Sequence, residues 1–149
     1  MGQEKILIDY DRLREVIINL LSNAIKYTAD DGQIEIEVVN QKEQVEVSVS
    51  DDGIGIPDDE LPYIWERFHQ VDRVRNPDSE GTGLGLAIVK EIIEGLGGEV
   101  KVESQEGVGS KFSFKINKRG PFGVVFYCLG NYVFLHTVDI FLLTLGSIL

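Results

Sequence analysis

The residues whose types and spacing most clearly suggest chemistry are three alternating glycines, Gly81, Gly83 and Gly85, which a strongly helical run follows. Glycine has no Cβ, so its backbone can lie close against a phosphate. A helix that begins directly after such a loop points its unpaired N–H groups, and the positive end of its dipole, at an anion bound there. The spacing therefore predicts an anion-binding loop.

The same loop excludes several common phosphate-binding patterns. A dinucleotide-binding loop would follow a strand and would have a glycine at the position of Leu86. A P-loop has Lys and then Ser or Thr after its last glycine, and neither residue type directly follows Gly85. The motifs of eukaryotic-type protein kinases are also absent. We therefore expect a phosphate loop of another kind.

A second group of polar residues shares one face of the helix predicted over Asp11–Thr28, because side chains three or four residues apart lie on the same face. The stripe consists of Glu15, Asn19, Asn23 and Lys26, with Tyr27 beside it. A carboxamide oxygen suits a Mg²⁺ ion that also contacts phosphates and waters, and lysine can meet a phosphate as a point charge. A solvated helix face gives the same pattern. Asparagine is a poor helix former, however, which weighs somewhat toward a binding role.

A carboxylate follows the strand predicted over Gln44–Ser50. Asp51 stands at the strand end, and Gly53 and Gly55 come directly after it. An ionised carboxylate accepts a hydrogen bond from an exocyclic amine such as that of adenine, and the glycines would let a flat base approach the backbone. Asp-Gly is also a strong turn signal, and this segment by itself favours a plain turn.

Composition narrows the possible partners. The chain has 149 residues and a formal net charge of −11, which argues against nucleic acid as a ligand. An acidic domain that binds a polyanionic nucleotide needs local countercharge, most simply Mg²⁺. The single cysteine, Cys128, cannot form an internal disulfide, and the N-terminus lacks the apolar core of a signal peptide. These features predict a cytoplasmic location.

The order of local patterns predicts a two-layer α/β sandwich, in which helices cover one face of a mixed sheet. Apolar spacing and helix-end signals predict helices over Asp11–Thr28, Asp58–Phe68 and Leu84–Leu96. Apolar and alternating runs predict strands over Lys5–Asp9, Gln33–Asn40, Gln44–Ser50, Glu99–Glu103 and Ser110–Ile116. Val71–Glu80 is predicted to be a loop, because it has little periodicity and contains an Asn-Pro pair.

The chain changes character after residue 120. Every Lys and Arg, and all but one Asp or Glu, lies before this point, whereas residues 121–149 carry only Asp139. We therefore divide the chain into a domain over 1–118 and an apolar tail over 119–149. Three interpretations of the tail compete: a reading-frame artefact, membrane contact, and a β-hairpin around Gly130-Asn131. The sequence favours the artefact first and membrane contact second.

Five segments, in order, resemble the motifs of the catalytic domain of bacterial sensor histidine kinases. They are Asn19–Thr28 (the N box), Asp51–Ile56 (G1), Trp65–Phe68 (F), Gly81–Leu86 (G2) and Gly107–Ser110 (the closing glycine motif). Each motif alone is unspecific, but all five occur with fitting spacing within residues 5–117. The resemblance implies the Bergerat ATP-binding fold, which gyrase, Hsp90 and MutL share.

The resemblance implies ATP and Mg²⁺ as ligands and assigns roles to the predicted site. Asn23 would hold Mg²⁺, with Asn19 near the metal and the phosphates. Lys26 and Tyr27 would line the phosphate and base regions, and Asn19, Asn23 and Lys26 together would form the catalytic group. Asp51 would bind the adenine amine. The residues that would surround the base with it are Gly53, Gly55 and Ile56.

The resemblance also implies a lid over the nucleotide, from about Phe68 to Gly81. Many relatives carry a basic residue where this chain has Gln70. Arg73 and Arg75 would contact the γ-phosphate instead, a role that arginine suits, although solvated loop charges would give the same pattern. The phosphate loop would comprise Gly81, Thr82, Gly83, Leu84, Gly85 and Leu86.

One position bears on the reaction. Hydrolytic relatives carry a water-activating glutamate where this chain has Asn19, which favours phosphoryl transfer to a protein. Neither His69 nor His136 fits the family's phosphoacceptor pattern. The resemblance therefore implies transfer to a histidine on a separate dimerisation domain of the same kinase, and from there to a response regulator. The alternatives are an ATP-sensing module without transfer activity and a Bergerat-fold ATPase.

Overall fold

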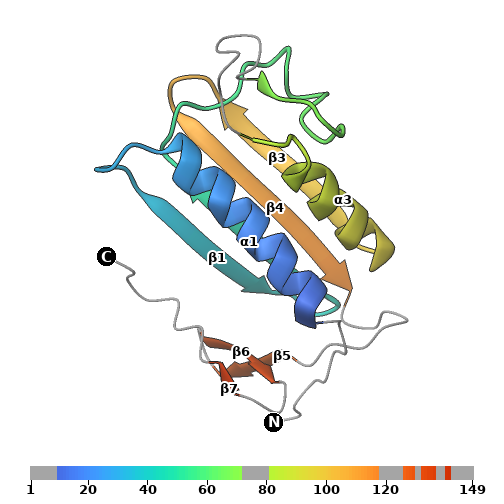
Figure 1. The fold of residues 1–149 in the computed structure, drawn as a ribbon. Coiled ribbons are helices and arrows are strands. Elements are labelled where there is room, and N and C mark those ends of the chain that lie inside the picture. The colour runs from blue at the N-terminus through green and yellow to red at the C-terminus, as the bar shows by residue number, and fades with distance from the viewer. Residues whose placement is uncertain (1–9, 72–80, 118–125, 130–131, 137–139, 142–149) are drawn as a thin grey trace.

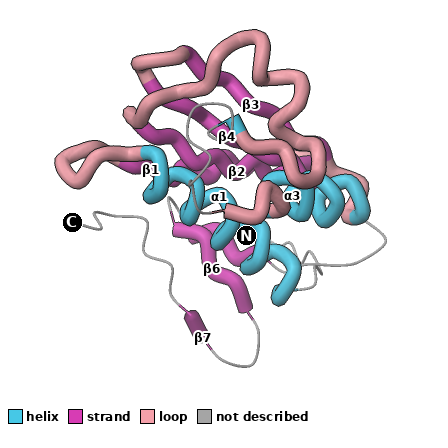
Figure 2. Tube along the Cα trace, turned by 45° about the horizontal axis from the view of Figure 1, so that its top comes forward, coloured by secondary structure: helices cyan, strands magenta, loops and turns pink. Residues whose placement is uncertain are grey.

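In the computed structural model, two helices lie side by side on one face of a four-stranded sheet (Figures 1 and 2). The structure describes residues 10–71, 81–117, 126–129, 132–136 and 140–141. The helices are α1 (Tyr10–Tyr27) and α3 (Gly85–Gly95). The strands are β1 (Ile34–Asn40), β2 (Gln44–Asp51), β3 (Glu99–Gln105) and β4 (Gly109–Asn117). The predicted two-layer α/β sandwich is confirmed, and these elements begin and end within two residues of the predicted bounds.

The described sheet is antiparallel throughout, whereas the sequence predicted a mixed sheet. Its strand order is β1-β2-β4-β3, and each neighbouring pair is antiparallel. Helix α3 connects β2 to β3, and these two strands run in the same direction. They do not pair with each other, because β4 turns back from β3 and lies between them. The crossover therefore produces no parallel pair among the described strands.

The sheet face under the helices is apolar along most of its length and becomes polar at one end. Side chains on one face recur at every second residue of each strand. One row across the strands joins Ile36, Val49, Phe112 and Val102, and the next joins Val38, Val47, Phe114 and Val100. The row at the opposite end joins Ile34, Asp51, Ser110 and Ser104. The core thus gives way to polar groups at this end of the sheet.

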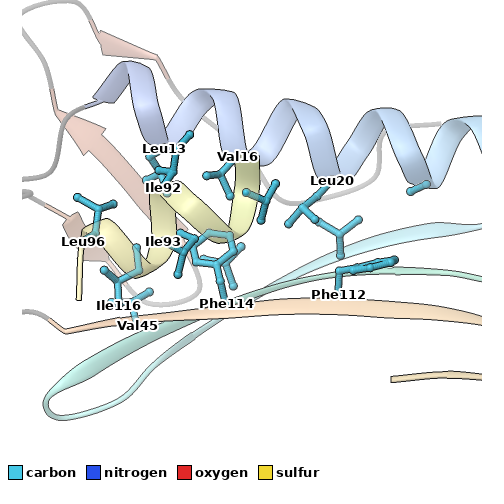
Figure 3. Close-up of a cluster of buried hydrophobic side chains, with 14 of the residues drawn as sticks. Leu13, Val16, Leu20, Val45, Ile92, Ile93, Leu96, Phe112, Phe114 and Ile116 are labelled. Carbon is cyan, nitrogen blue, oxygen red and sulfur yellow. The ribbon is translucent and has the colours of Figure 1, made fainter. Parts of the chain in front are cut away.

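Side chains of both helices bury the apolar rows (Figure 3). Val16 and Leu20 of α1 and Val89 and Ile93 of α3 are at most 1% exposed, as is Phe114 of β4. Burying each such side chain contributes about 1.5–3 kcal/mol of transfer free energy. The helices are therefore fixed on the sheet by apolar contacts, and this fixes the direction in which their polar residues point.

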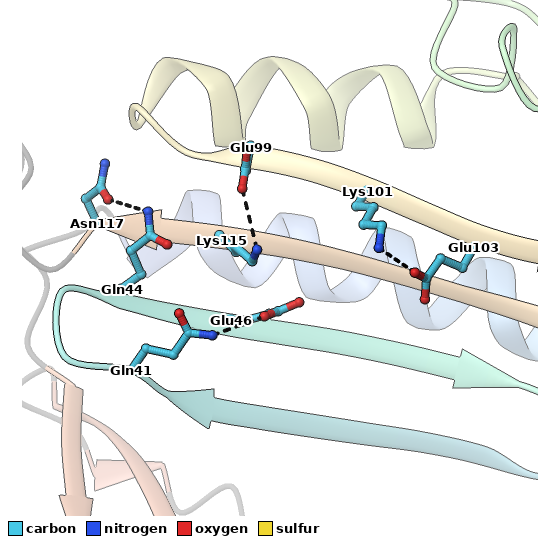
Figure 4. Close-up of polar contacts among 8 residues, drawn as sticks. All are labelled: Gln41, Gln44, Glu46, Glu99, Lys101, Glu103, Lys115 and Asn117. Carbon is cyan, nitrogen blue, oxygen red and sulfur yellow. Dashed lines mark hydrogen bonds and ion pairs between the residues drawn. The ribbon is translucent and has the colours of Figure 1, made fainter.

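The opposite face of the sheet carries charged and amide side chains (Figure 4). Lys115 Nζ lies 3.7 Å from Glu99 Oε1, and Gln44 Nε2 donates to Asn117 Oδ1 at 2.9 Å. Lys111 Nζ lies 3.5 Å from a carboxylate oxygen of Glu37. Exposed ion pairs such as these contribute little to stability, so this face mainly keeps the sheet solvated.

The helix predicted over Asp58–Phe68 is wrong. The segment forms successive turns, in which Glu60 N–H donates to Pro57 O at 3.0 Å and Tyr63 N–H donates to Glu60 O at 3.0 Å. Pro62 explains the difference, because proline has no N–H and disfavours helical backbone at the residue before it. The turns are held to the sheet by buried Ile64 and by Trp65. The Trp65 and Phe112 rings pack edge to face, with their centroids 6.0 Å apart.

Several predicted features lie outside the described residues: the strand over Lys5–Asp9 and all of the loop over Val71–Glu80 except Val71. In the tail, β5 (Phe126–Leu129), β6 (Tyr132–His136) and β7 (Ile140–Phe141) form a separate antiparallel sheet. The pairing of β5 with β6 agrees with the β-hairpin interpretation of the tail. Within the described parts of the chain, no helix is both long and apolar enough to span a bilayer.

Candidate functional site

A cavity of about 280 Å³ lies at the polar end of the sheet. Its walls come from the second half of α1, the ends of β2 and β4, the turn segment after β2 and the start of α3. We call the part formed by Asp51, Ile56 and Ser110 the sheet end. The part formed by Lys26 and the glycine loop before α3 is called the loop end.

Most of the predicted site residues meet at this cavity. The lining includes Asn19, Asn23, Lys26, Tyr27, Asp51, Gly55, Ile56, Gly81, Thr82, Gly83, Gly85 and Leu86. Gly53, Phe68 and Leu84 do not line it. Arg73 and Arg75 lie outside the described residues, so their expected contact with a phosphate stays a prediction. The structure thus brings together three segments that are far apart in the sequence.

At the sheet end, the Asp51 carboxylate is held by backbone groups. Its Oδ1 accepts the Gly53 N–H at 3.0 Å, and the Ser110 N–H also donates to this carboxylate. Partial burial raises the pKa of Asp51 above its ordinary value, and the neighbouring Asp52 charge adds to this, while the two N–H groups oppose it. An ionised carboxylate only accepts hydrogen bonds. Asp51 therefore offers an acceptor to a ligand amine.

The glycines after Asp51 are required by the protein's own backbone, which the sequence did not indicate. A Cβ on Gly53 would lie 2.3 Å from Tyr27 O, at the end of α1. Gly55 has φ +67°, and a Cβ there would lie 2.0 Å from Gln105 O. Two backbone hydrogen bonds accompany these approaches, from Ile54 N–H to Tyr27 O at 3.2 Å and from Gly107 N–H to Ile54 O at 2.7 Å. The segment is therefore clamped between α1 and the β3–β4 turn.

The loop end combines one cation with a helix N-terminus. Lys26 is the only Lys or Arg among the described lining residues. Its Nζ donates to Tyr27 Oη at 3.2 Å and lies 3.2 Å from where a Cβ on Gly81 would be. Helix α3 follows, and Leu84 at its cap position supplies no side-chain hydrogen bond. A helix start without such a cap leaves N–H groups that suit an anion.

The two asparagines of α1 are placed differently. Asn19 Nδ2 donates to Glu15 O at 2.9 Å, and its Oδ1 lies 3.0 Å from where a Cβ on Gly85 would be. Gly85 therefore allows the start of α3 to approach α1 closely. Asn23 is half-buried and lines the cavity one turn further along, on the side of Lys26 and Tyr27.

The predicted lid segment is tied at its base. Phe68 N–H donates to Gly83 O at 2.9 Å, and Gln70 Nε2 donates to Gly81 O. Phe68 has φ +65°, is 67% exposed and does not line the cavity. Gly83 has φ +66°, and a Cβ there would lie 2.8 Å from His69 O. These contacts bring the two ends of residues 71–80 together.

Sequence reasoning missed several lining residues. They are Ile54, Ile64, Ser110 and Phe112, together with His69, Gln70 and Val71, which the resemblance placed in the lid without a contact of their own. Strand alternation puts Ser110 on the same sheet face as Phe112, but only the pairing of β2 with β4 puts it beside Asp51. His69, which does not fit the phosphoacceptor pattern, also lines the cavity, and its Nε2 lies 2.7 Å from Glu60 Oε2. Side chains brought in by pairing and turns leave no local sequence signal.

Comparison with known proteins agrees with this geometry. Residues 8–120 match the family described as "Histidine kinase-, DNA gyrase B-, and HSP90-like ATPase". The sensor histidine kinase WalK of Bacillus subtilis is 40% identical over 111 residues, which are 73% of this chain and 18% of WalK. The circadian input-output histidine kinase CikA of Synechococcus elongatus is 42% identical over 105 residues, 70% of this chain and 14% of CikA. The chain thus spans less than a fifth of either relative.

Solved structures show the same fold. The catalytic domain of histidine kinase ThkA is 36% identical, with a TM-score of 0.64 over 74% of this chain and 69% of that one. Full-length ShkA in complex with AMPPNP is 33% identical, with a TM-score of 0.66 over 85% of this chain and 24% of ShkA. The chain therefore belongs to the histidine kinase-, DNA gyrase B- and HSP90-like ATPase family and contains a nucleotide-binding catalytic domain of the sensor histidine kinase type, with the Bergerat fold.

Proposed function

We propose that this domain binds Mg-ATP and donates the γ-phosphoryl group to a histidine on a separate dimerisation domain of the same kinase. The observation that carries the proposal is the polarity of the cavity. A half-buried acceptor, Asp51, stands at the sheet end, while Lys26 and the start of α3 stand at the loop end. This arrangement suits a ligand with an amine-bearing base at one end and phosphates at the other.

The proposed orientation assigns the predicted site residues to two groups. Asp51, Gly55 and Ile56 surround the base at the sheet end, with Gly53 holding the Asp51 carboxylate through its N–H. At the loop end, Lys26 and the N–H groups of Gly83, Gly85 and Leu86 face the phosphates. The further predicted contacts are with Tyr27, Phe68, Arg73, Arg75, Gly81, Thr82 and Leu84.

The chemistry of the donor set is compatible with Mg²⁺. Among the described residues, no group of three or more His, Cys, Asp or Glu side chains is arranged to hold a metal. The Asn23 carboxamide, together with waters and phosphate oxygens, is a donor set that Mg²⁺ accepts. Lys26, the one Lys or Arg of the described lining, does not balance a triphosphate, and Mg²⁺ held by Asn23 would supply further positive charge.

The residues of this chain act on the reaction mainly by positioning. Phosphoryl transfer depends largely on orientation and charge stabilisation, so the domain needs an external acceptor to show activity. No carboxylate stands at the position of Asn19, and the Asn19 amide contacts Glu15 O and lies beside Gly85. This favours transfer to a protein over activation of water. We propose a response regulator as the final acceptor, a cytoplasmic location and a division into residues 1–118 and an additional tail, 119–149.

A direct test uses the chain, labelled Mg-ATP and a purified dimerisation domain that carries the acceptor histidine. We expect label on that histidine, and none when it is replaced by Gln. Saturable binding of ATP without transfer would indicate a sensing module instead. Steady release of free phosphate without acceptor would identify an ATPase and overturn the proposal.

A further inference from the structure

The Ser104 hydroxyl joins three segments at the sheet end of the cavity, although it does not line the cavity itself. Its Oγ accepts the Ile56 N–H at 2.8 Å, from the segment after β2. It donates to Gly109 O at 3.0 Å, at the start of β4. Its third contact is with Ser110 Oγ at 2.9 Å. Ile56 and Ser110 are both wall residues, so one half-buried hydroxyl holds two parts of the wall.

The number of protons in this cluster sets the direction of the contact between the two serines. A serine hydroxyl has one proton to donate and two lone pairs to accept with. When the Ser104 proton is donated to Gly109 O, the Ser110 hydroxyl must donate its own proton to Ser104. Ser104 then makes one donated and two accepted hydrogen bonds, which saturates it. The Ser110 oxygen is left with lone pairs alone for any further partner.

A second acceptor lies beside Ser110, on the neighbouring strand β2. Ser110 is paired with Ser104 on one side and with Asp51 on the other, and all three side chains lie on the face that bears the helices. Asp51 carries no proton to donate when ionised. Two adjacent wall groups therefore present only acceptors to a base.

We propose that Ser104 is a positioning residue that orients the Ser110 hydroxyl and thereby makes the sheet end selective for a base with an exocyclic amine. The proposal rests on the proposed function, because it concerns the nucleotide that this cavity takes. A purine with an amine at position 6 donates to these acceptors, whereas an oxygen at position 6 has no proton to donate and brings its lone pairs against theirs. An unpaired buried polar group is more costly than a missing contact.

The experiment compares binding of ADP with binding of inosine diphosphate, which carries an oxygen at position 6, by titration calorimetry. Wild type is expected to prefer ADP. Ser104→Ala is expected to reduce the ratio of the two affinities about tenfold, because the Ser110 hydroxyl is then free to rotate and donate. Ser104→Thr keeps the hydroxyl and is expected to keep the affinity ratio of wild type. Ser113→Ala removes a buried serine from the opposite face of β4 and serves as the matched control.

Ser110→Ala supplies an independent arm of the test. It should reduce the ratio about as much as Ser104→Ala, and the double variant should reduce it no further, since both changes act through one hydroxyl. An unchanged ratio in either single variant, or additive effects in the double variant, overturns the inference. If wild type binds neither diphosphate, the proposed function itself fails. If wild type binds ADP and inosine diphosphate equally well, the selectivity proposed here is wrong, but the proposed function is unaffected.

Discussion

The sheet end of the cavity is built from paired strands, whereas its loop end is assembled from a helix and the two described segments that flank residues 72–80. Asp51 and Ser110 face each other across β2 and β4, and backbone N–H groups hold the Asp51 carboxylate. At the loop end, Phe68 N–H and Gln70 Nε2 connect to the glycine loop, and Lys26 reaches Gly81 from α1. The sheet end is therefore set by the fold itself. The loop end depends on a few contacts between segments.

Glycines at the two ends of the cavity serve different purposes. Gly55 approaches backbone that belongs to the sheet, whereas Gly83 approaches the backbone of Phe68 and His69, at the start of the predicted lid. A change at the first position should disturb the whole domain. A change at the second should disturb mainly the predicted lid. The predictions below test the contrast between the sheet end and the loop end, beginning with the largest expected effect.

Gly55→Ala should destabilise the domain by about 2–4 kcal/mol, because a Cβ would meet Gln105 O in a left-handed backbone conformation. Gly97→Ala is the matched control, since Gly97 also has a positive φ but nothing lies within 4 Å of its Cβ position. Strain alone should cost the control about 1–2 kcal/mol. Urea unfolding measures both losses. Equal losses would mean that the contact with the β3–β4 turn is unimportant.

Asp51→Asn should weaken ADP binding at least about tenfold, because it replaces a charged acceptor at the sheet end. The same change should not lower the free energy of unfolding at neutral pH, since burial makes ionised Asp51 unfavourable. Titration calorimetry and urea unfolding measure the two effects separately. Loss of stability without loss of affinity would show that Asp51 is structural and remove it from the site.

Lys26→Gln should weaken ATP binding about tenfold and leave adenosine binding unchanged, because Lys26 stands only at the loop end. Lys90→Gln is the control, since Lys90 lies on α3 and does not line the cavity. Competition binding with ATP and adenosine gives both affinities. A similar loss for the two ligands would place Lys26 at the base and contradict the proposed orientation.

The pH dependence of stability should report the burial of Asp51. Its pKa is raised on folding, so the folded state binds this proton more tightly than the unfolded state. The contribution of Asp51 to the free energy of unfolding should therefore fall as pH rises from the ordinary value of 3.8 through the raised pKa, and be level above it. The difference in the free energy of unfolding between wild type and Asp51→Asn, measured with urea across this pH range, isolates the effect. A difference that increases with pH would contradict it.

The smallest effect is expected for the pair between Arg67 and Glu91, which connects the turn segment to α3. Arg67 Nη2 lies 2.7 Å from Glu91 Oε2, but the two side chains are 66% and 67% exposed. A double-mutant cycle with alanine at both positions should give a coupling free energy of at most about 1 kcal/mol. A larger coupling would mean that the loop end is held more firmly than its contacts suggest.

Local patterns were sufficient for the main helices, the four strands and most of the cavity lining. Helix α1 carries its apolar and polar stripes in its own periodicity, and the glycine loop before α3 carries its signal in three alternating residues. The acidic residues that open Asp58–Phe68 were misleading as a helix signal, because Pro62 interrupts the hydrogen bonds that a helix needs. These features depend on neighbours in the chain, so a sequence can reveal them.

Only the tertiary structure decided which residues meet. The insertion of β4 between β2 and β3 puts Ser110 beside Asp51 and Ser104, and it makes the described sheet antiparallel. Strand register is a property of two distant segments together, and a shift by one residue would turn every side chain to the opposite face. Glycine spacing, the asparagines of α1 and the Asp-Gly turn were therefore visible in the sequence. The polar row that joins Asp51, Ser110 and Ser104 exists only once the strands have paired.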